Sequence, residues 1–180
     1  MRKSVLLLAS VLAVTLLATA SQAQQQINFG DLPLSPVPSP VPLGYHQLNW
    51  ANIFFVDPNL YTSSGPGYLN LFTRRDVAFV GGQFCAPVQS ACFGIISVPG
   101  GPIAVQVSSA VMSAGFASAS ATFTAYQYGE YRGTMTVNLT TTPSLIRFPS
   151  SWGAITEMQI QTDQAGNVVL SDLSVYRLGG

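Results

Sequence analysis

From Asn52 onward, apolar and polar residues alternate along much of the chain with a period of two, which is typical of strands with one buried face. The alternation is clearest in residues 134–140, where Met135, Val137 and Leu139 share one face. It predicts strands over 52–57, 67–73, 76–81, 92–98, 102–113, 118–128, 131–141, 144–148, 153–162 and 167–178. Short strands split by Gly, Pro, Ser and Asn indicate an all-β chain, folded as an antiparallel β-sandwich or jelly roll.

Residues 1–23 have the pattern of a secretory signal peptide. A basic start precedes an apolar run over 5–18, which is short for a membrane span. Small residues within 21–23 then precede a cleavage point, so we expect the mature chain to begin at Gln24. The sequence therefore predicts a secreted protein with one β-sandwich domain over residues 24–180 and no membrane span.

Removal of this leader leaves a chain with few charges. Five arginines stand against seven aspartates and glutamates, which gives a net charge of −2, and no lysine remains. Such a chain has no basic patch that would neutralise phosphate groups. We therefore expect neither nucleic acid nor an anionic membrane surface as a partner.

Residues 33–42 contain five prolines. Proline lacks a backbone donor and fixes φ near the polyproline value, so this segment is expected to be an extended loop and not sheet interior. A covering loop and a proline-rich ligand for a partner domain are the two interpretations of it.

The two cysteines, Cys85 and Cys92, lie close together in the sequence. In an exported chain, such a pair is typical of a local disulfide that staples a loop. Zinc binding needs more ligands than these two, and His46, the one histidine of the chain, is far away in the sequence.

The stretch Gly44-Tyr45-His46-Gln47-Leu48-Asn49-Trp50-Ala51-Asn52-Ile53-Phe54-Phe55 resembles the opening signature, GY-x-G-LNW-x-NF, of a family of secreted fungal and bacterial proteins. Members of that family are similar to galactose-binding-like jelly rolls of the carbohydrate-binding type. The order of the later strands, up to the terminal stretch 170–175, follows the same family, so the likeness covers most of residues 27–178. It implies a jelly-roll fold and a carbohydrate ligand.

The resemblance also implies that the first and last strands are neighbours and that carboxylates there hold a structural calcium ion. The family often has Phe-Asp-Asp-Leu at the start and a second acid or Asn near the end, whereas this chain has Phe29-Gly30-Asp31-Leu32 and Ser171-Asp172-Leu173. Calcium requires six to eight oxygen ligands, of which Asp31 and Asp172 would supply two. The alternative is that both are edge carboxylates that bond turn amides.

Few residues of this chain suit catalysis. No serine lies in a Gly-x-Ser-x-Gly elbow, and His46 would have to serve as the base of any nucleophilic mechanism. Glycoside hydrolysis needs two facing carboxylates, but Glu130 and Glu157 each lack an acidic neighbour on the same face. We therefore expect a protein that is not an enzyme, and a divergent hydrolase that uses Glu130 or Glu157 is the alternative.

Aromatic residues gather around the polar turn 127–133, and sugars stack on such rings while polar neighbours bind their hydroxyls. Alternation places Tyr126 and Tyr128 opposite Phe123 and Ala125, so the two tyrosines face solvent if the other pair is buried. The predicted ligand-binding residues are Tyr126, Tyr128, Tyr131, Arg132 and Trp152. The alternative is that these aromatics cover the rim of the core.

Asn138-Leu139-Thr140 is a glycosylation sequon, and alternation with apolar neighbours turns Asn138 towards solvent.

Taken together, these features of the sequence favour a secreted, non-catalytic β-sandwich that binds cell-wall or host-surface glycan. An extracellular protein-interaction, effector or structural role without sugar binding is the second hypothesis.

Overall fold

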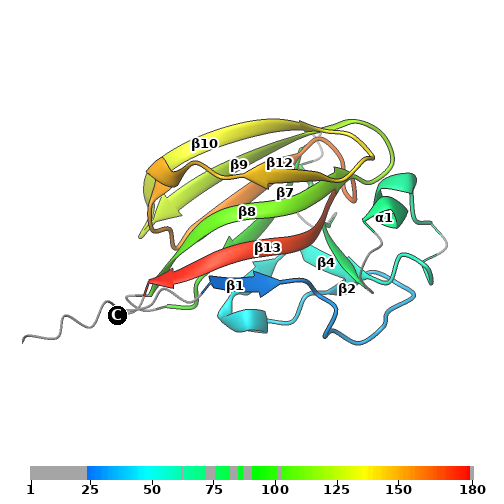
Figure 1. Cartoon of the computed structure of the whole chain (residues 1–180), viewed down its shortest axis with the longest axis horizontal. Coiled ribbons are helices and arrows are strands. Elements are labelled where there is room, and N and C mark those ends of the chain that lie inside the picture. The colour runs from blue at the N-terminus through cyan, green and yellow to red at the C-terminus, as the bar shows by residue number, and fades with distance from the viewer. Residues whose placement is uncertain are drawn as a thin grey trace, which may run out of the picture.

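Two antiparallel β-sheets packed face to face make up the protein (Figure 1). This computed structural model describes residues 24–61, 63–71, 76–81, 85–86, 91–100 and 103–178. The signal peptide expected over residues 1–23 lies outside the described residues. Where the structure describes the chain, no helix has both the length and the apolar character that crossing a membrane requires.

The strands divide between a sheet A and a sheet B. Sheet A contains, in spatial order, β11 (Ser144–Arg147), β8 (Ala104–Ala114), β13 (Val168–Leu178), β5 (Val77–Val80), β4 (Ile53–Val56) and β2 (Ser39–Pro40), with β1 (Gln24–Ile27) also paired to β13. Sheet B contains β10 (Glu130–Leu139), β9 (Ala119–Gln127), β12 (Glu157–Thr162), β7 (Ala91–Ser97) and β3 (Asn49–Ala51), with β6 (Cys85–Ala86) also paired to β7. The helices η1 (Tyr45–Gln47), α1 (Pro66–Asn70) and η2 (Ser150–Trp152) lie outside the sheets. The predicted antiparallel sandwich is confirmed.

The first and last strands are neighbours, as expected. β1 pairs with β13 in a register that runs from Gln24 opposite Tyr176 to Ile27 opposite Leu173. β1 ends at Ile27. The chain turns there because Phe29 adopts a left-handed backbone with φ of 59°, and the amide of Leu32 donates to the carbonyl of Phe29 at 3.1 Å.

The strand predicted over 67–73 is wrong, because residues 66–70 form helix α1. Pro66 stands at the start of the helix, where its fixed φ and missing donor cost nothing. Gly67 packs so closely against β8 that an added Cβ would lie 1.6 Å from the carbonyl oxygen of Ala114. This close approach of two backbones explains why a helical turn fits where the apolar pattern alone predicts a strand.

The core lies between the sheets and is built from the inward half of each alternating strand. Phe123 and Ala125 of β9 are fully buried, and Met158 and Ile160 of β12 are each only 1% exposed. Trp50 of β3 is also buried. Burial of these faces removes apolar area from water and is the main force that holds the two sheets together.

The chain passes from one sheet to the other at Asn52. β3, before it, belongs to sheet B, and β4, after it, belongs to sheet A. Asn52 adopts φ of 55°, a left-handed conformation that asparagine tolerates better than most residues. Its buried Nδ2 donates to the carbonyls of Gly81, at the end of β5, and of Phe93, in β7, at 2.9 and 2.6 Å. One side chain therefore ties both sheets at the point of crossing.

The proline-rich segment 33–42 follows the edge of sheet A. Within it, the two residues of β2 pair with Phe55 and Phe54 of β4. Proline is compatible with an edge strand because one side of such a strand needs no donor. The prediction that this segment stays out of the sheet interior is confirmed.

Candidate functional site

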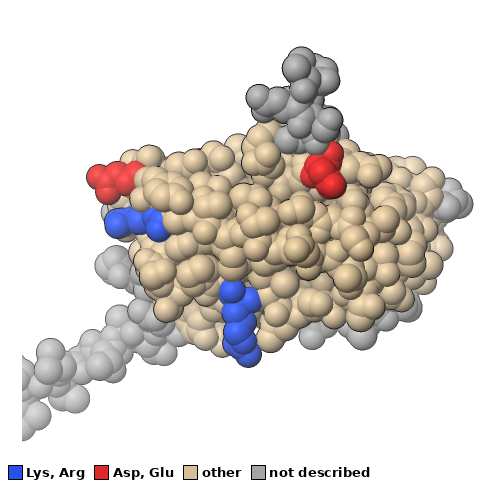
Figure 2. Space-filling view, turned by 90° about the horizontal axis from the view of Figure 1, so that it is seen from above, with Lys and Arg blue, Asp and Glu red and all other residues tan. Residues whose placement is uncertain are grey.

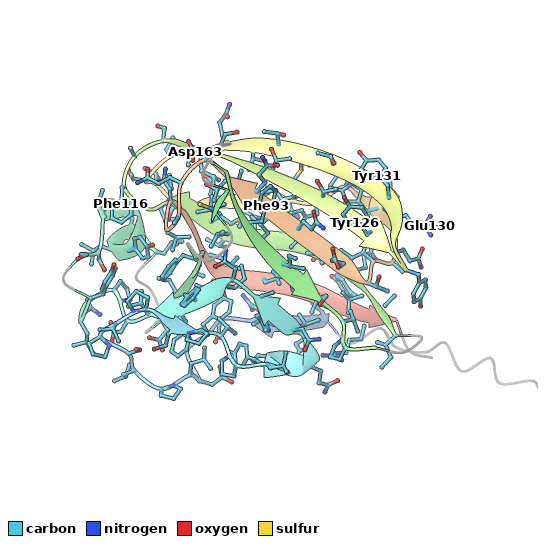
Figure 3. All side chains as sticks on the ribbon, turned by 180° about the vertical axis from the view of Figure 1, so that it is seen from behind. Phe93, Phe116, Tyr126, Glu130, Tyr131 and Asp163 are labelled. Atoms are coloured by element: carbon cyan, nitrogen blue, oxygen red, sulfur yellow. The ribbon has the colours of Figure 1, made fainter. Side chains whose placement is uncertain are left out.

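The outer face of sheet B carries mostly uncharged polar side chains. Because Ala121, Phe123 and Ala125 of β9 point inward, the intervening threonines point outward. They pair with threonines of β10: Thr122 with Thr136 at 2.9 Å and Thr124 with Thr134 at 3.1 Å between hydroxyl oxygens. Figure 3 shows this face, with Tyr126, Tyr131 and Glu130 at one end and Phe116 and Asp163 at the other.

A groove of about 490 Å³ lies at the tyrosine end of this face. Strands β7, β9 and β12 and the residues next to their ends supply its lining: Ser97, Val98, Tyr126, Gly129, Thr156, Glu157 and Gln159. The sheet register brings these residues together, because Glu157 stands opposite both Tyr126 on one side and Ser97 on the other. One aromatic ring, one carboxylate and several neutral hydrogen-bonding groups therefore converge.

Hydrogen bonds hold the groove in shape. Gln159 donates from Nε2 to Glu157 Oε1 at 2.8 Å, which orients the carboxylate. The hydroxyl of Thr156 accepts from the amide of Tyr128 at 2.8 Å, and the amide of Thr156 donates to the carbonyl of Tyr126 at 2.8 Å. The groove walls are thus fixed by the protein before any ligand arrives, which lowers the entropy cost of binding.

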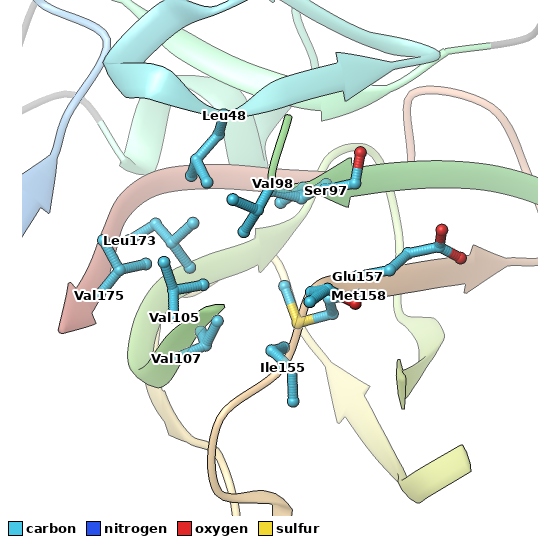
Figure 4. A pocket seen from close by; sticks show the side chains of 12 residues that line it. Leu48, Ser97, Val98, Val105, Val107, Ile155, Glu157, Met158, Leu173 and Val175 are labelled. Carbon is cyan, nitrogen blue, oxygen red and sulfur yellow. The ribbon is translucent and has the colours of Figure 1, made fainter. Parts of the chain in front are cut away.

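The space between the two sheets below the groove is closed to ligands of any size. Apolar side chains fill it, among them Leu48, Val98 and Leu173 (Figure 4). The remaining gap of about 10 Å³ is close to the space that one water molecule needs. The space between the sheets at this point therefore cannot hold a ligand, whereas the groove on the outer face of sheet B is open.

Charge is sparse around this region. Figure 2 looks down on β10 and its neighbours and shows a few charged side chains around the margin of a broad uncharged surface. Among the described residues that line the groove, Glu157 is the one charged group. The groove therefore suits a neutral ligand with many hydroxyl groups better than an anion.

The predicted tyrosines lie at this end of sheet B, in different roles. Tyr126 lines the groove, and its ring meets that of Tyr131 edge to face, with centroids 6.3 Å apart at 72°. Tyr131 is 62% exposed and stands directly opposite Tyr126 in the register. Tyr128 is 60% exposed at the tip of the β9–β10 hairpin, where it and Gly129 adopt the left-handed conformations of a two-residue turn.

Arg132 serves the hairpin and does not line the groove. It lies at the bulge between Tyr131 and Gly133, and its guanidinium donates to Gln127 Oε1 on the neighbouring strand. Bulges of this kind re-aim side chains and increase the local twist of the sheet.

The expectation that Trp152 is available to a ligand is wrong. Its side chain is 5% exposed and packs against Phe148, with ring centroids 5.7 Å apart. The indole also covers Gly133 of β10, where an added Cβ would meet Trp152 Nε1 at 2.4 Å. Trp152 lies in the core because η2 folds it inward, and the serines and glycine around it suggested an exposed loop instead.

Four polar residues of the groove were not predicted as ligand contacts: Ser97, Thr156, Gln159 and Glu157. Glu157 had been considered only as a candidate catalytic acid. Alternation along residues 157–162 would have shown that Glu157 and Gln159 share the outer face. The pairing of β12 with β7 and β9 could not be derived from the sequence, and this pairing is what brings them beside Ser97 and Tyr126.

The two glutamates considered for hydrolysis do not face each other. Glu157 stands opposite Tyr126 and Glu130 stands opposite Gln127, and consecutive residues of β9 point to opposite faces. A glycosidase needs two carboxylates that flank one bond. Glu130 and Glu157 do not form such a pair.

His46 and Asp31 meet in a second polar cluster, beside η1. His46 Nε2 lies 3.5 Å from Asp31 Oδ2, and the hydroxyl of Tyr45 donates to Asp31 Oδ1. The Tyr45 hydrogen bond holds the pKa of Asp31 below its usual value, while burial and the Asp31 carboxylate raise the pKa of Tyr45. On the other side of the imidazole, Gln25 Nε2 lies 2.7 Å from Nδ1.

The residues present do not fit the calcium ion that the resemblance implied. Asp31 is bound by Tyr45 and His46, whereas Asp172 accepts hydrogen bonds from Gln26 Nε2 at 3.0 Å and from the hydroxyl of Ser171 at 3.2 Å. Within the described part of the chain, no three His, Cys, Asp or Glu side chains come together as a metal site. Calcium needs more oxygen ligands than this edge gathers.

Comparison with known proteins supports the fold. No family model matches the chain, and no curated protein matches it in sequence. A DUF4465 family protein from Bacteroides caccae is similar in structure, with a TM-score of 0.54, 9% identity, and coverage of 91% of this chain and 96% of that one. At this identity the likeness concerns the fold alone.

Two more distant likenesses carry no argument of their own. One is to the CBM22-1–GH10 modules of a Clostridium thermocellum xylanase in complex with xylohexaose, at a TM-score of 0.42 and 11% identity, over 83% of this chain and 29% of that one. The other is to TmCBM61 in complex with β-1,4-galactotriose, at 0.35 and 11%, over 77% and 95%.

Proposed function

We propose that this chain is a non-catalytic, secreted β-sandwich module that binds an uncharged carbohydrate in the groove on sheet B. The observation that carries the proposal is the convergence of the Tyr126 ring with Glu157, Gln159 and Ser97 in one preformed groove. Sugar rings stack their C–H faces on aromatic rings, and polar side chains fix the hydroxyl groups. The membership of the secreted family suggested by residues 44–55 stays a prediction.

Binding to a panel of neutral and acidic polysaccharides tests the proposal, with residues 24–180 as the protein. Tyr126→Ala is expected to weaken binding of the captured polysaccharide roughly tenfold, because the stacking surface is lost. Phe116→Ala is the matched control, since Phe116 is an exposed aromatic at the opposite end of the molecule (Figure 3). Equal loss in both variants, or no binding to any polysaccharide, would contradict the proposal. Capture of a protein partner that ignores added sugar would favour the protein-interaction hypothesis instead.

Three features of an exported protein belong to the same proposal: cleavage before Gln24, a Cys85–Cys92 disulfide and a glycan on Asn138. The backbone register places Cys85 directly opposite Cys92, as a cross-strand disulfide requires, but the Cys85 side chain lies outside what the structure describes. Asn138 is exposed on β10, seven residues from Tyr131, or roughly 23 Å along a strand, so its glycan would be attached away from the groove. Intact mass of the exported protein, before and after reduction and deglycosylation, checks all three.

A further inference from the structure

The register of sheet B continues the groove into a row of outward side chains that crosses five strands. Tyr131 stands opposite Tyr126, Tyr126 opposite Glu157, Glu157 opposite Ser97, and Ser97 opposite Asn49. The next residue of each inner strand, such as Ala125, Met158 and Ile96, points into the core, so the row itself faces outward. Four spacings of about 4.8 Å give a row of roughly 19 Å.

The row ends on an edge strand at each side. β10 and β3 are the outer strands at this end of sheet B, and where the structure describes the chain no further strand pairs with them there. A site that recognises the end of a chain needs a wall against that end, whereas a row that runs off both edges of a sheet admits a polymer that continues in both directions. The geometry therefore favours the interior of a chain over its terminus.

The chemistry changes along the row. Its β10 and β9 end offers two aromatic rings, and its centre offers the Glu157 carboxylate, which Gln159 orients at 2.8 Å. Its β7 and β3 end offers the hydroxyl of Ser97 and the amide of Asn49, both of which donate and accept. The row contains no cation, so a uronate or sulfate would meet Glu157 without a compensating charge, whereas sugar hydroxyls would donate to it.

We propose that this row is an extended subsite for the interior of an uncharged polysaccharide chain, with Asn49 as a binding residue at the end opposite the tyrosines. The inference rests on the proposed function of the groove and extends it in length, charge preference and residues. It also gives Asn49, which stands in the opening signature stretch, a role on the surface while its neighbour Trp50 lies in the core.

Calorimetric titration with oligosaccharides of increasing length tests the row. The probes are gluco-, xylo- and galacto-oligosaccharides from disaccharide to hexasaccharide, with oligogalacturonates of equal length as the anionic series. Affinity for the neutral series that binds is expected to rise until the ligand spans the row. Asn49→Ala is expected to weaken the longest ligand about threefold to tenfold, through loss of hydrogen bonds, and to leave the disaccharide unchanged.

Gln161→Ala is the matched control, because Gln161 is exposed on the same face of β12 as Glu157 but stands outside the row. Its affinities are expected to equal those of the parent protein, and thermal unfolding checks that Asn49→Ala stays folded. Length-independent affinity that Tyr126→Ala abolishes and Asn49→Ala leaves intact would overturn the extended row while the proposed function survives. Tighter binding of oligogalacturonates would overturn the charge preference. Absence of binding to every series would overturn both proposals.

Discussion

Apart from Asn49, which belongs to the outward row of sheet B, the opening segment, residues 44–56, uses its polar side chains in the opposite way to the groove. In the opening segment these side chains bond back to the protein: Trp50 Nε1 donates to the carbonyl of Tyr45 at 2.9 Å, and Asn52 donates to carbonyls of both sheets. In the groove, the polar groups of Ser97, Tyr126 and Glu157 line open space. Trp50 and Asn52 of the opening segment thus hold the fold together. The groove residues come from separate strands, and the sheet register aligns them into a surface for a ligand.

Among the substitutions that test this comparison, Asn52→Ala is expected to cause the largest loss of stability. The change removes the Nδ2 donor from the carbonyls of Gly81 and Phe93 and should lower the free energy of unfolding by about 2–3 kcal/mol. Urea unfolding measures it. Asn70→Ala is the matched control, because Asn70 is an exposed asparagine that also donates to a carbonyl, that of Thr141, at 2.9 Å, and its loss should stay within about 0.5 kcal/mol.

Asn52→Gly separates the two contributions of this residue, since glycine keeps the left-handed backbone and removes both hydrogen bonds. A stability equal to that of the parent protein would show that the backbone conformation, and not the bonds, decides the crossing. Equal losses in the Asn52→Ala and Asn70→Ala proteins would remove the special role of the crossing point.

Near the groove, Gly133 is the residue whose substitution is expected to lower the stability of the protein. Its φ of 155° and the 2.4 Å approach of an added Cβ to Trp152 Nε1 predict that Gly133→Ala costs about 1–3 kcal/mol. The hairpin that carries Tyr126 and Tyr131 should shift at the same time, so carbohydrate affinity should fall too. Gly100→Ala is the control, because nothing lies within 4 Å of an added Cβ there. Unchanged unfolding of the Gly133→Ala protein would show that Trp152 moves aside at no cost.

A smaller, pH-dependent effect is expected from Tyr45→Phe, which removes the hydroxyl that donates to Asp31. Because this hydrogen bond lowers the pKa of Asp31 in the folded protein, its stabilisation is present above the usual value of 3.8 and is lost as the pH falls through the lower, folded value. Asp31 is largely exposed, so the effect at neutral pH should not exceed about 1 kcal/mol. The difference between the two proteins should therefore shrink below about pH 4. A difference that grows on acidification would contradict the assignment.

The smallest expected effect is that of a chelator. Since Asp31 and Asp172 have different hydrogen-bond partners, removal of divalent cations should leave the midpoint of thermal unfolding unchanged. A midpoint that falls with chelator and returns with added calcium would restore the metal site implied by the resemblance.

The architecture could largely be predicted from the sequence, because the alternation of apolar and polar residues is a local property of each strand. The alternating pattern placed Phe123 and Ala125 on one face, which proves to be the inward one. The resemblance predicted that the first and last strands, β1 and β13, are neighbours. Local pattern failed where tertiary contacts decide, as at Gly67, which lets α1 approach β8, and at Trp152, which η2 turns into the core.

The candidate site was predictable in part. The β9–β10 turn marked Tyr126 and Tyr131, because aromatic residues beside polar turns are visible in one stretch of chain. Ser97, Glu157 and Asn49 join them only through strand pairings between segments far apart in the sequence, and no local pattern specifies such pairings.

The most direct test of the contrast between groove and opening segment is an NMR titration of residues 24–180 with a neutral oligosaccharide that binds. The backbone amides of Ser97, Tyr126 and Glu157 are predicted to shift, whereas those of Tyr45, His46 and Asn52 stay in place. Shifts confined to the Tyr45–His46 cluster, with the groove amides unmoved, would contradict the account.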